Sequence, residues 1–126
     1  MKRLDLIKQI IARKEQLNIT IENLAKLSSL GVRTVNRVLA NEDVKLSTIE
    51  SITNFLGLDF AGNEVVSLDE LKKHRAKQKA TFMASLVQST SALEMQGLDE
   101  NSVNSIISMY EKEFLNGNYQ DTLWVA

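Results

Sequence analysis

Proline is absent from the whole chain of 126 residues. An average chain of this length would hold roughly six prolines. Proline interrupts a helix because it lacks a backbone N–H and clashes with the preceding turn. Glycine is also scarce, at five residues. The Asn-Gly and Asp-Gly dipeptides that favour hairpins are missing, apart from Asn116-Gly117, which lies beyond the last apolar repeat. These features predict an all-α protein.

The composition excludes several classes of protein. Without cysteine there can be no disulfide and no thiolate metal site. No apolar run is long enough to cross a membrane. The first ten residues, MKRLDLIKQI, carry charges within their apolar pattern and are not typical of a signal peptide. We therefore expect a cytoplasmic protein with no membrane partner.

Apolar residues at helical spacing predict four helices in the first half of the chain. In the first, Leu4, Ile7, Ile10 and Ile11 repeat at that spacing. The expected ranges are about 2–16, 21–27, 32–39 and 47–56.

Local signals define the ends of the fourth helix. Ser47 and Glu50 fit a capping box, and Gly57 suits a left-handed helix end. Beyond this end, Leu58 and Phe60 are expected to fold back onto the core.

The segment AGNEVV, residues 61–66, is the predicted boundary between a domain at 1–62 and a helical region at 63–126. Ser67 and Glu70 form a second possible capping box, which would open a long helix.

Further along, we expect Gly97 to end this long helix and Asp99 to cap a last one. About 60 residues make a marginal core, so the second region is expected to pack on another copy, on the first domain or on another protein.

The stretch LAKLSSLGVRTVNRVLA, residues 24–40, reads as two short helices joined by a tight turn. Ala25 is small enough to let two crossing helices approach. The apolar contacts would be made by Leu24, Leu30, Val35 and Val38. Arg33 and Arg37 fall on the outer side of the second helix. This pattern is typical of the helix-turn-helix, whose second helix enters the major groove of DNA.

The same stretch resembles the helix-turn-helix of lambda-repressor-like (Cro-type) regulators, and TVNRVL is similar to the recognition helix of lac-repressor-type proteins. The first likeness continues through LSTIESITNFLGLD and covers roughly residues 4–60. It implies a compact DNA-binding domain of four to five helices, followed by a C-terminal helical extension. The turn position usually held by Gly is Ser29, which must then adopt a positive φ.

The predicted DNA contacts lie on and around the second helix of this pair. Arg33 suits the O6 and N7 acceptors of guanine, and Val32 suits a thymine methyl. Thr20 stands at a helix N-terminus, where anions are favoured. The full predicted set is Thr20, Gly31, Val32, Arg33, Thr34, Asn36, Arg37, Asn41 and Lys45. In the alternative interpretation, Arg33 and Arg37 are solvated surface charges.

Aromatic and aliphatic residues of the second half are candidates for a dimer or partner surface. They are Phe82, Leu86, Ile107, Tyr110 and Trp124. Alternatively, Trp124 closes the chain's own core. The basic run from Lys72 to Lys79 either adds phosphate contacts or is simply a solvated helix start.

Charge is distributed unevenly. Residues 1–62 hold nine Lys or Arg against seven Asp or Glu, a net of +2, whereas residues 63–126 have six against nine, a net of −3. A basic front half and an acidic back half fit a DNA reader joined to a partner module.

No metal site, cofactor or catalytic group is expected. The one histidine, His74, stands among lysines, and no serine has a partner base at motif spacing. The leading hypothesis is a dimeric, sequence-specific repressor that binds double-stranded DNA. The alternatives are an antitoxin that holds a toxin through its C-terminal helices, and a protein-interaction adaptor that does not bind DNA.

Overall fold

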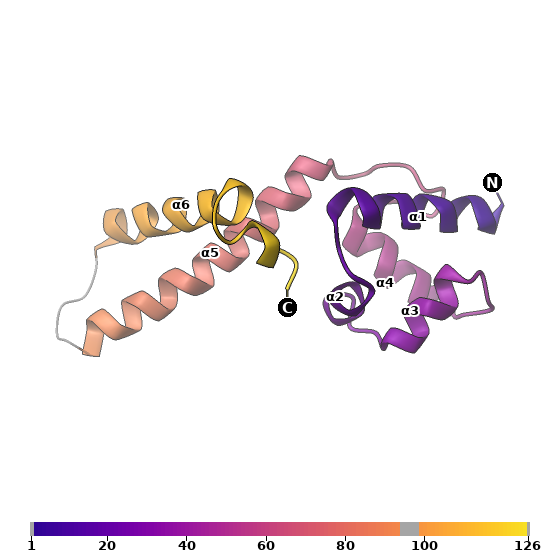
Figure 1. Cartoon of the computed structure of the whole chain (residues 1–126), viewed down its shortest axis with the longest axis horizontal. Coiled ribbons are helices and arrows are strands. Elements are labelled where there is room, and N and C mark those ends of the chain that lie inside the picture. The colour runs from indigo at the N-terminus through magenta and orange to yellow at the C-terminus, as the bar shows by residue number, and fades with distance from the viewer. Residues whose placement is uncertain (1, 94–98, 126) are drawn as a thin grey trace. The chain divides into compact units, whose positions relative to one another are not determined.

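The computed structural model describes residues 2–93 and 99–125, and the regular structure within these ranges is helical (Figure 1). The predicted all-α class is confirmed. The elements are α1 (Arg3–Leu17), α2 (Ile21–Leu27), α3 (Val32–Leu39), α4 (Leu46–Leu56), α5 (Leu68–Leu93), α6 (Glu100–Asn116) and a 3-10 helix, η1 (Gln120–Thr122). None of the described helices is long and apolar enough to span a membrane.

Contacts divide the chain into two compact units. Unit 1 comprises Met1–Leu71 with Trp124–Ala126, and unit 2 comprises Lys72–Leu123. The change of unit therefore falls inside α5, after its first turn.

In unit 1, α2 packs against α3, and α1 packs against both α3 and α4. The apolar stripe of α1 is rotated from the predicted one, because Leu6 is buried while Leu4 is exposed. The main buried apolar side chains are Leu6, Ile7, Ile10, Leu17, Leu24, Ala25, Val35, Val38, Ile49, Ile52 and Leu56. They form one core beneath the four helices.

The two predicted ends of α4 have different outcomes. Gly57 adopts φ 70° and ends the helix as expected. A Cβ there would lie 3.0 Å from the Cβ of Val66. The capping box at Ser47 is wrong: the helix begins at Leu46, with Lys45 as N-cap. Ser47 is already helical, so its hydroxyl cannot cap the first turn.

The residues after α4 also behave differently from one another. Leu58 is buried as predicted, but the prediction for Phe60 is wrong, since 49% of it is exposed. The Asp59 carboxylate accepts hydrogen bonds from the N–H groups of Ala61 and Asn63, both at 2.9 Å. This tight turn leaves Phe60 at the surface.

Unit 2 contains most of α5, together with α6 and η1. Ala76, Ala80 and Ala84 lie one turn apart on α5 and are buried. Their small side chains allow close packing. The ammonium of Lys79 lies 5.5 Å from the centre of the Phe114 ring, so α5 and α6 are in contact.

Caps predicted for the second half are present. Ser67 Oγ accepts from the N–H of Glu70 at 3.1 Å, and Asp99 Oδ1 accepts from the N–H of Ser102 at 2.7 Å. The Ser102 hydrogen bonds lower the pKa of the Asp99 carboxyl. The helix end predicted at Gly97 lies outside the described residues.

A buried arginine joins distant parts of unit 1. Arg13 of α1 is 5% exposed. Its Nε donates to the carbonyl of Leu56 at 2.9 Å, and its Nη1 donates to the Glu64 carboxylate at 2.6 Å. Its Nη2 donates to the carbonyl of Val66. One guanidinium thus binds the last residue of α4 and two residues near the end of the following loop.

We predict that Arg13→Met lowers the free energy of unfolding by about 2–4 kcal/mol, because it leaves buried carbonyls without donors. Chemical denaturation of the full chain measures this change. Glu64→Gln should cost less than about 1 kcal/mol, because the Glu64 side chain is 53% exposed and water can solvate it. Equal losses for the two variants would contradict this assignment.

Candidate nucleic-acid interface

The turn between α2 and α3 sets the position of α3. The N–H of Leu30 donates to the carbonyl of Ala25 at 2.8 Å, and that of Ser29 donates to Lys26 at 3.2 Å. Ser29 adopts φ 59°, the left-handed conformation that the missing glycine would otherwise provide. Ala25 is buried, as predicted. The helices therefore approach closely although a serine occupies the turn.

α3 has one buried and one exposed side. On one side, Val35 and Val38 are fully buried in the core of unit 1. On the other side, Arg33, Asn36 and Arg37 are exposed. These three polar residues lie within about one turn of each other on the same side, as expected for spacings of three and four. A shallow surface depression follows this side and is lined by Val32, Arg33, Asn36, Arg37, Ala40 and Glu42.

The two arginines have different surroundings. Nη2 of Arg37 donates to the carbonyl of Asp43 at 3.0 Å, which holds its guanidinium beside the loop that follows α3. No hydrogen bond or ion pair with the described residues holds the side chain of Arg33. Arg33 is therefore available to an external ligand, while Arg37 is already oriented.

The other predicted DNA-contact residues surround this side at varying exposure. Gly31 is the N-cap of α3, and a Cβ added there would meet no atom within 4 Å. The hydroxyl of Thr20 caps α2 by accepting from the N–H of Asn23 at 3.1 Å. Thr34 is half-buried. Asn41 and Lys45 are exposed in the loop between α3 and α4.

Acidic residues at the same edge were not among the predicted site residues. Glu42 lines the depression, and Asp43 forms an ion pair with Arg3 at 3.1 Å. The polar run Asn41-Glu42-Asp43 predicts a loop. Nothing in it indicates that Glu42 would line the same depression as Arg37.

The five predicted partner residues differ in exposure. Phe82 is 63% exposed and Leu86 is 50% exposed, whereas Ile107 and Tyr110 are half-buried. Trp124 is 8% exposed and packs edge-on against Phe55, with 5.8 Å between ring centres. Trp124 thus takes the alternative place in the chain's own core.

Polar groups fix the segment that precedes Trp124. Nε of Arg75 donates to the carbonyl of Leu123 at 2.9 Å, and Nζ of Lys79 donates to that of Thr122. Partial burial lowers the pKa of both basic groups, and the charge of Arg75 adds to the shift at Lys79.

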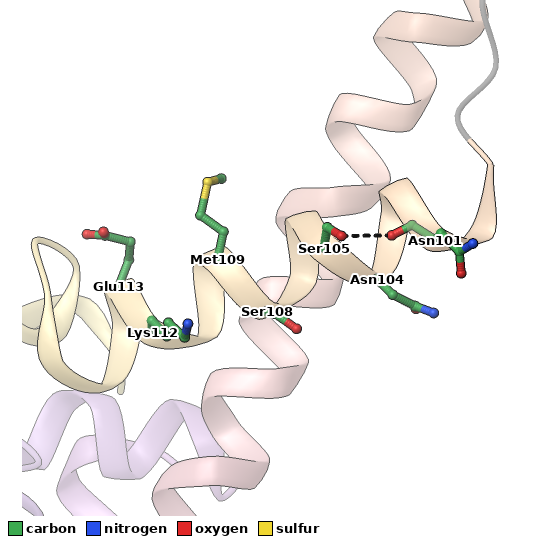
Figure 2. A pocket seen from close by; sticks show the side chains of 7 residues that line it. All are labelled: Asn101, Asn104, Ser105, Ser108, Met109, Lys112 and Glu113. Carbon is green, nitrogen blue, oxygen red and sulfur yellow. Dashed lines mark hydrogen bonds between the residues drawn. The ribbon is translucent and has the colours of Figure 1, made fainter.

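A second depression lies along α6, as Figure 2 shows. Its lining side chains all come from this one helix: Asn101, Asn104, Ser105, Ser108, Met109, Lys112 and Glu113. The Ser105 hydroxyl donates to the backbone carbonyl of Asn101. This is a shallow helix side without convergent titratable groups. Across residues 2–93 and 99–125, no cluster of His, Asp or Glu could hold a metal ion.

No protein-family model, curated protein or solved structure gives a significant match to this chain.

The turn geometry leads to a prediction about stability. Ser29→Gly should raise the free energy of unfolding by about 0.5 kcal/mol, because relief of left-handed strain exceeds the added entropy of the unfolded chain. Thermal or chemical unfolding measures the effect. Ser29→Ala keeps a Cβ and should bring no gain. A loss of stability in the glycine variant would mean that the residue does not hold a positive φ.

Proposed function

We propose that this protein is a sequence-specific DNA-binding regulator of transcription, of the repressor type, which acts as a dimer on an inverted-repeat operator. The observation that carries the proposal is the two-sided character of α3. Its valines are fully buried, and its outward side presents Arg33, Asn36 and Arg37 around one depression. A helix anchored in this way can enter a groove without unfolding.

The packing of α2 and α3 supports a helix-turn-helix arrangement. α2 contacts α3, and the left-handed residue in the turn directs the chain from one helix to the next. In helix-turn-helix proteins, the N-terminal residues of the second helix contact base edges. Here those residues are Val32 and Arg33, which are both exposed.

The chemistry of these side chains suggests how bases would be read. The Arg33 guanidinium matches the paired O6 and N7 acceptors of guanine, and Val32 offers an apolar contact to a thymine methyl. The side-chain amide of Asn36 has one acceptor oxygen and one donor nitrogen, which can pair with the N6–H donor and the N7 acceptor of adenine. Arg37 lies one turn further, where its bond to the Asp43 carbonyl holds it for a phosphate or a second base.

Electrostatics favours base reading over general attraction to DNA. The net charge of the chain is −1, and Glu42 stands at the edge of the depression. Sequence-independent binding depends on cations that neutralise phosphates. Residues 1–62 hold nine Lys or Arg against seven Asp or Glu, an excess of only two cations, so the affinity of the protein for unrelated DNA should be weak.

A dimer is proposed because one short helix reads only a few base pairs. Two copies related by a two-fold axis would place two α3 helices in successive major grooves, about 34 Å apart. Phe82 and Leu86 lie one turn apart on α5 with half or more of each side chain exposed. Their burial between copies would remove apolar surface from water.

The same exposed apolar residues favour a second candidate function. An antitoxin would use Phe82 and Leu86 to hold a toxin while α3 binds the operator. Co-purification of the chain with the protein encoded beside it would distinguish this candidate from the repressor.

The DNA-binding proposal predicts different effects for two basic residues. Arg33→Ala should weaken operator binding by roughly 1–3 kcal/mol and relax the preference at one base position. Lys45→Ala should weaken binding to all sequences alike, because it removes a phosphate contact. Selection of bound sequences from random duplexes, followed by titration of the selected site, measures both effects.

Lys8→Ala is the matched control, since Lys8 is an exposed cation of α1 outside the depression. An equal loss on every sequence for Arg33→Ala would count against base reading. If no duplex is retarded at low salt, DNA binding is refuted and the adaptor hypothesis gains support.

The dimer proposal predicts that Phe82→Ser weakens self-association about tenfold or more, because each copy loses a buried aromatic ring. Sedimentation over a range of concentrations measures the dissociation constant. Thr81→Ser changes the exposed neighbouring residue and should have no effect. Identical constants for wild type and Phe82→Ser would place the dimer contact elsewhere.

A further inference from the structure

The loop after α3 begins at a well-defined helix end. Asn41 adopts φ 59°, and its N–H donates to the carbonyl of Val38 at 3.0 Å. The N–H of Glu42 donates to the carbonyl of Arg37, also at 3.0 Å. A left-handed residue with these two bonds forms the Schellman motif, which satisfies the last carbonyls of a helix. The backbone of Glu42 is therefore held against the last turn of α3.

The side chain of Glu42 has no partner among the residues that the structure describes. It is exposed and lines the α3 depression, where the other charged lining residues are the cations Arg33 and Arg37. No hydrogen bond or ion pair within residues 2–93 and 99–125 holds its carboxylate. The neighbouring Asp43, in contrast, pairs with Arg3 at 3.1 Å. Glu42 thus brings an uncompensated negative charge to this depression.

This charge restricts what the depression can bind. A phosphate placed against the carboxylate would meet a like charge. An ionised carboxylate only accepts hydrogen bonds, so its favourable partner is a donor. In the major groove, the donors are the amino groups of adenine and cytosine. The adenine amino group stands beside the N7 acceptor, which would repel the second carboxylate oxygen, whereas the cytosine edge carries its donor alone.

We propose that Glu42 is a specificity-determining residue of the α3 surface, and that its carboxylate accepts a hydrogen bond from the N4 amino group of a cytosine. The inference rests on the proposed function, since it names a base that the same surface would read. Where another base occupies that position, the carboxylate loses its hydrogen bonds to water and gains no donor of matching geometry. Glu42 therefore selects its site largely by penalising the alternatives.

Two substitutions distinguish the hydrogen bond from the charge. Bound sequences are selected from random duplexes with wild type, Glu42→Ala and Glu42→Gln, and the selected sites are then titrated. Wild type should prefer cytosine at one position by about fivefold or more. Glu42→Ala should lose that preference and keep the guanine assigned to Arg33. Glu42→Gln should shift the preference toward adenine, because an amide can pair with both N6 and N7.

Binding to unrelated duplexes measures the penalty. Glu42→Ala and Glu42→Gln should each raise this affinity about threefold or more, because a negative charge near the phosphates is removed. Glu15→Gln is the matched control, since Glu15 is an exposed carboxylate of α1 outside the depression. It changes the net charge equally and should leave the selected sequence and the affinity for unrelated DNA nearly unchanged. An equal rise for Glu15→Gln would overturn the penalty assigned to Glu42.

The inference and the proposed function can fail separately. If wild type retards DNA and Glu42→Ala selects the same sequence, Glu42 reads no base and the inference alone is wrong. Loss of a preference for any base other than cytosine would also overturn the assignment. If neither wild type nor the two Glu42 variants retard any duplex at low salt, the DNA-binding function fails and the inference fails with it.

Discussion

The guanidinium of Arg13 is the interaction on which the arrangement of unit 1 depends. The last carbonyls of a helix have no partner within the helix. At the end of α4, Arg13 donates to the carbonyl of Leu56, and it also binds Glu64 and Val66 in the loop beyond. α1 and the end of α4 are thereby held together. α3 packs on α1. The orientation of α3 therefore depends on hydrogen bonds that Arg13 of α1 forms with the end of α4 and the following loop.

The helices α2 and α3 could be predicted from local sequence, and Arg13 could not. In the segment 24–40, a small residue at the crossing and aliphatic residues at helical spacing determine which sides are buried, and these signals lie within a few residues of each other. From the sequence alone, Arg13 would instead be interpreted as a solvated charge between apolar residues. Its burial is balanced by acceptors 43 to 53 positions away along the chain, and no local pattern reveals them. The same limit explains Phe60, whose exposure follows from hydrogen bonds to Asp59.

The candidate site could be predicted in part for similar reasons. The spacing of Arg33, Asn36 and Arg37 follows from helical geometry, so their shared exposure was expected. The difference between the two arginines was not, because the carbonyl of Asp43 that holds Arg37 belongs to an irregular loop. For Trp124 the sequence left two interpretations open. Residue type alone does not distinguish an aromatic ring that packs inward, such as Trp124, from one that stays exposed, such as Phe82.

Asp43 connects the start of α1 to the side that α3 presents to solvent. Its backbone carbonyl accepts from Arg37 at the edge of the α3 depression, and its carboxylate pairs with Arg3 of α1. Two arginines from different helices therefore meet at one residue of the loop after α3. In the proposed function this loop orients Arg37 for DNA, so its attachment to α1 would contribute to how the reading side is presented.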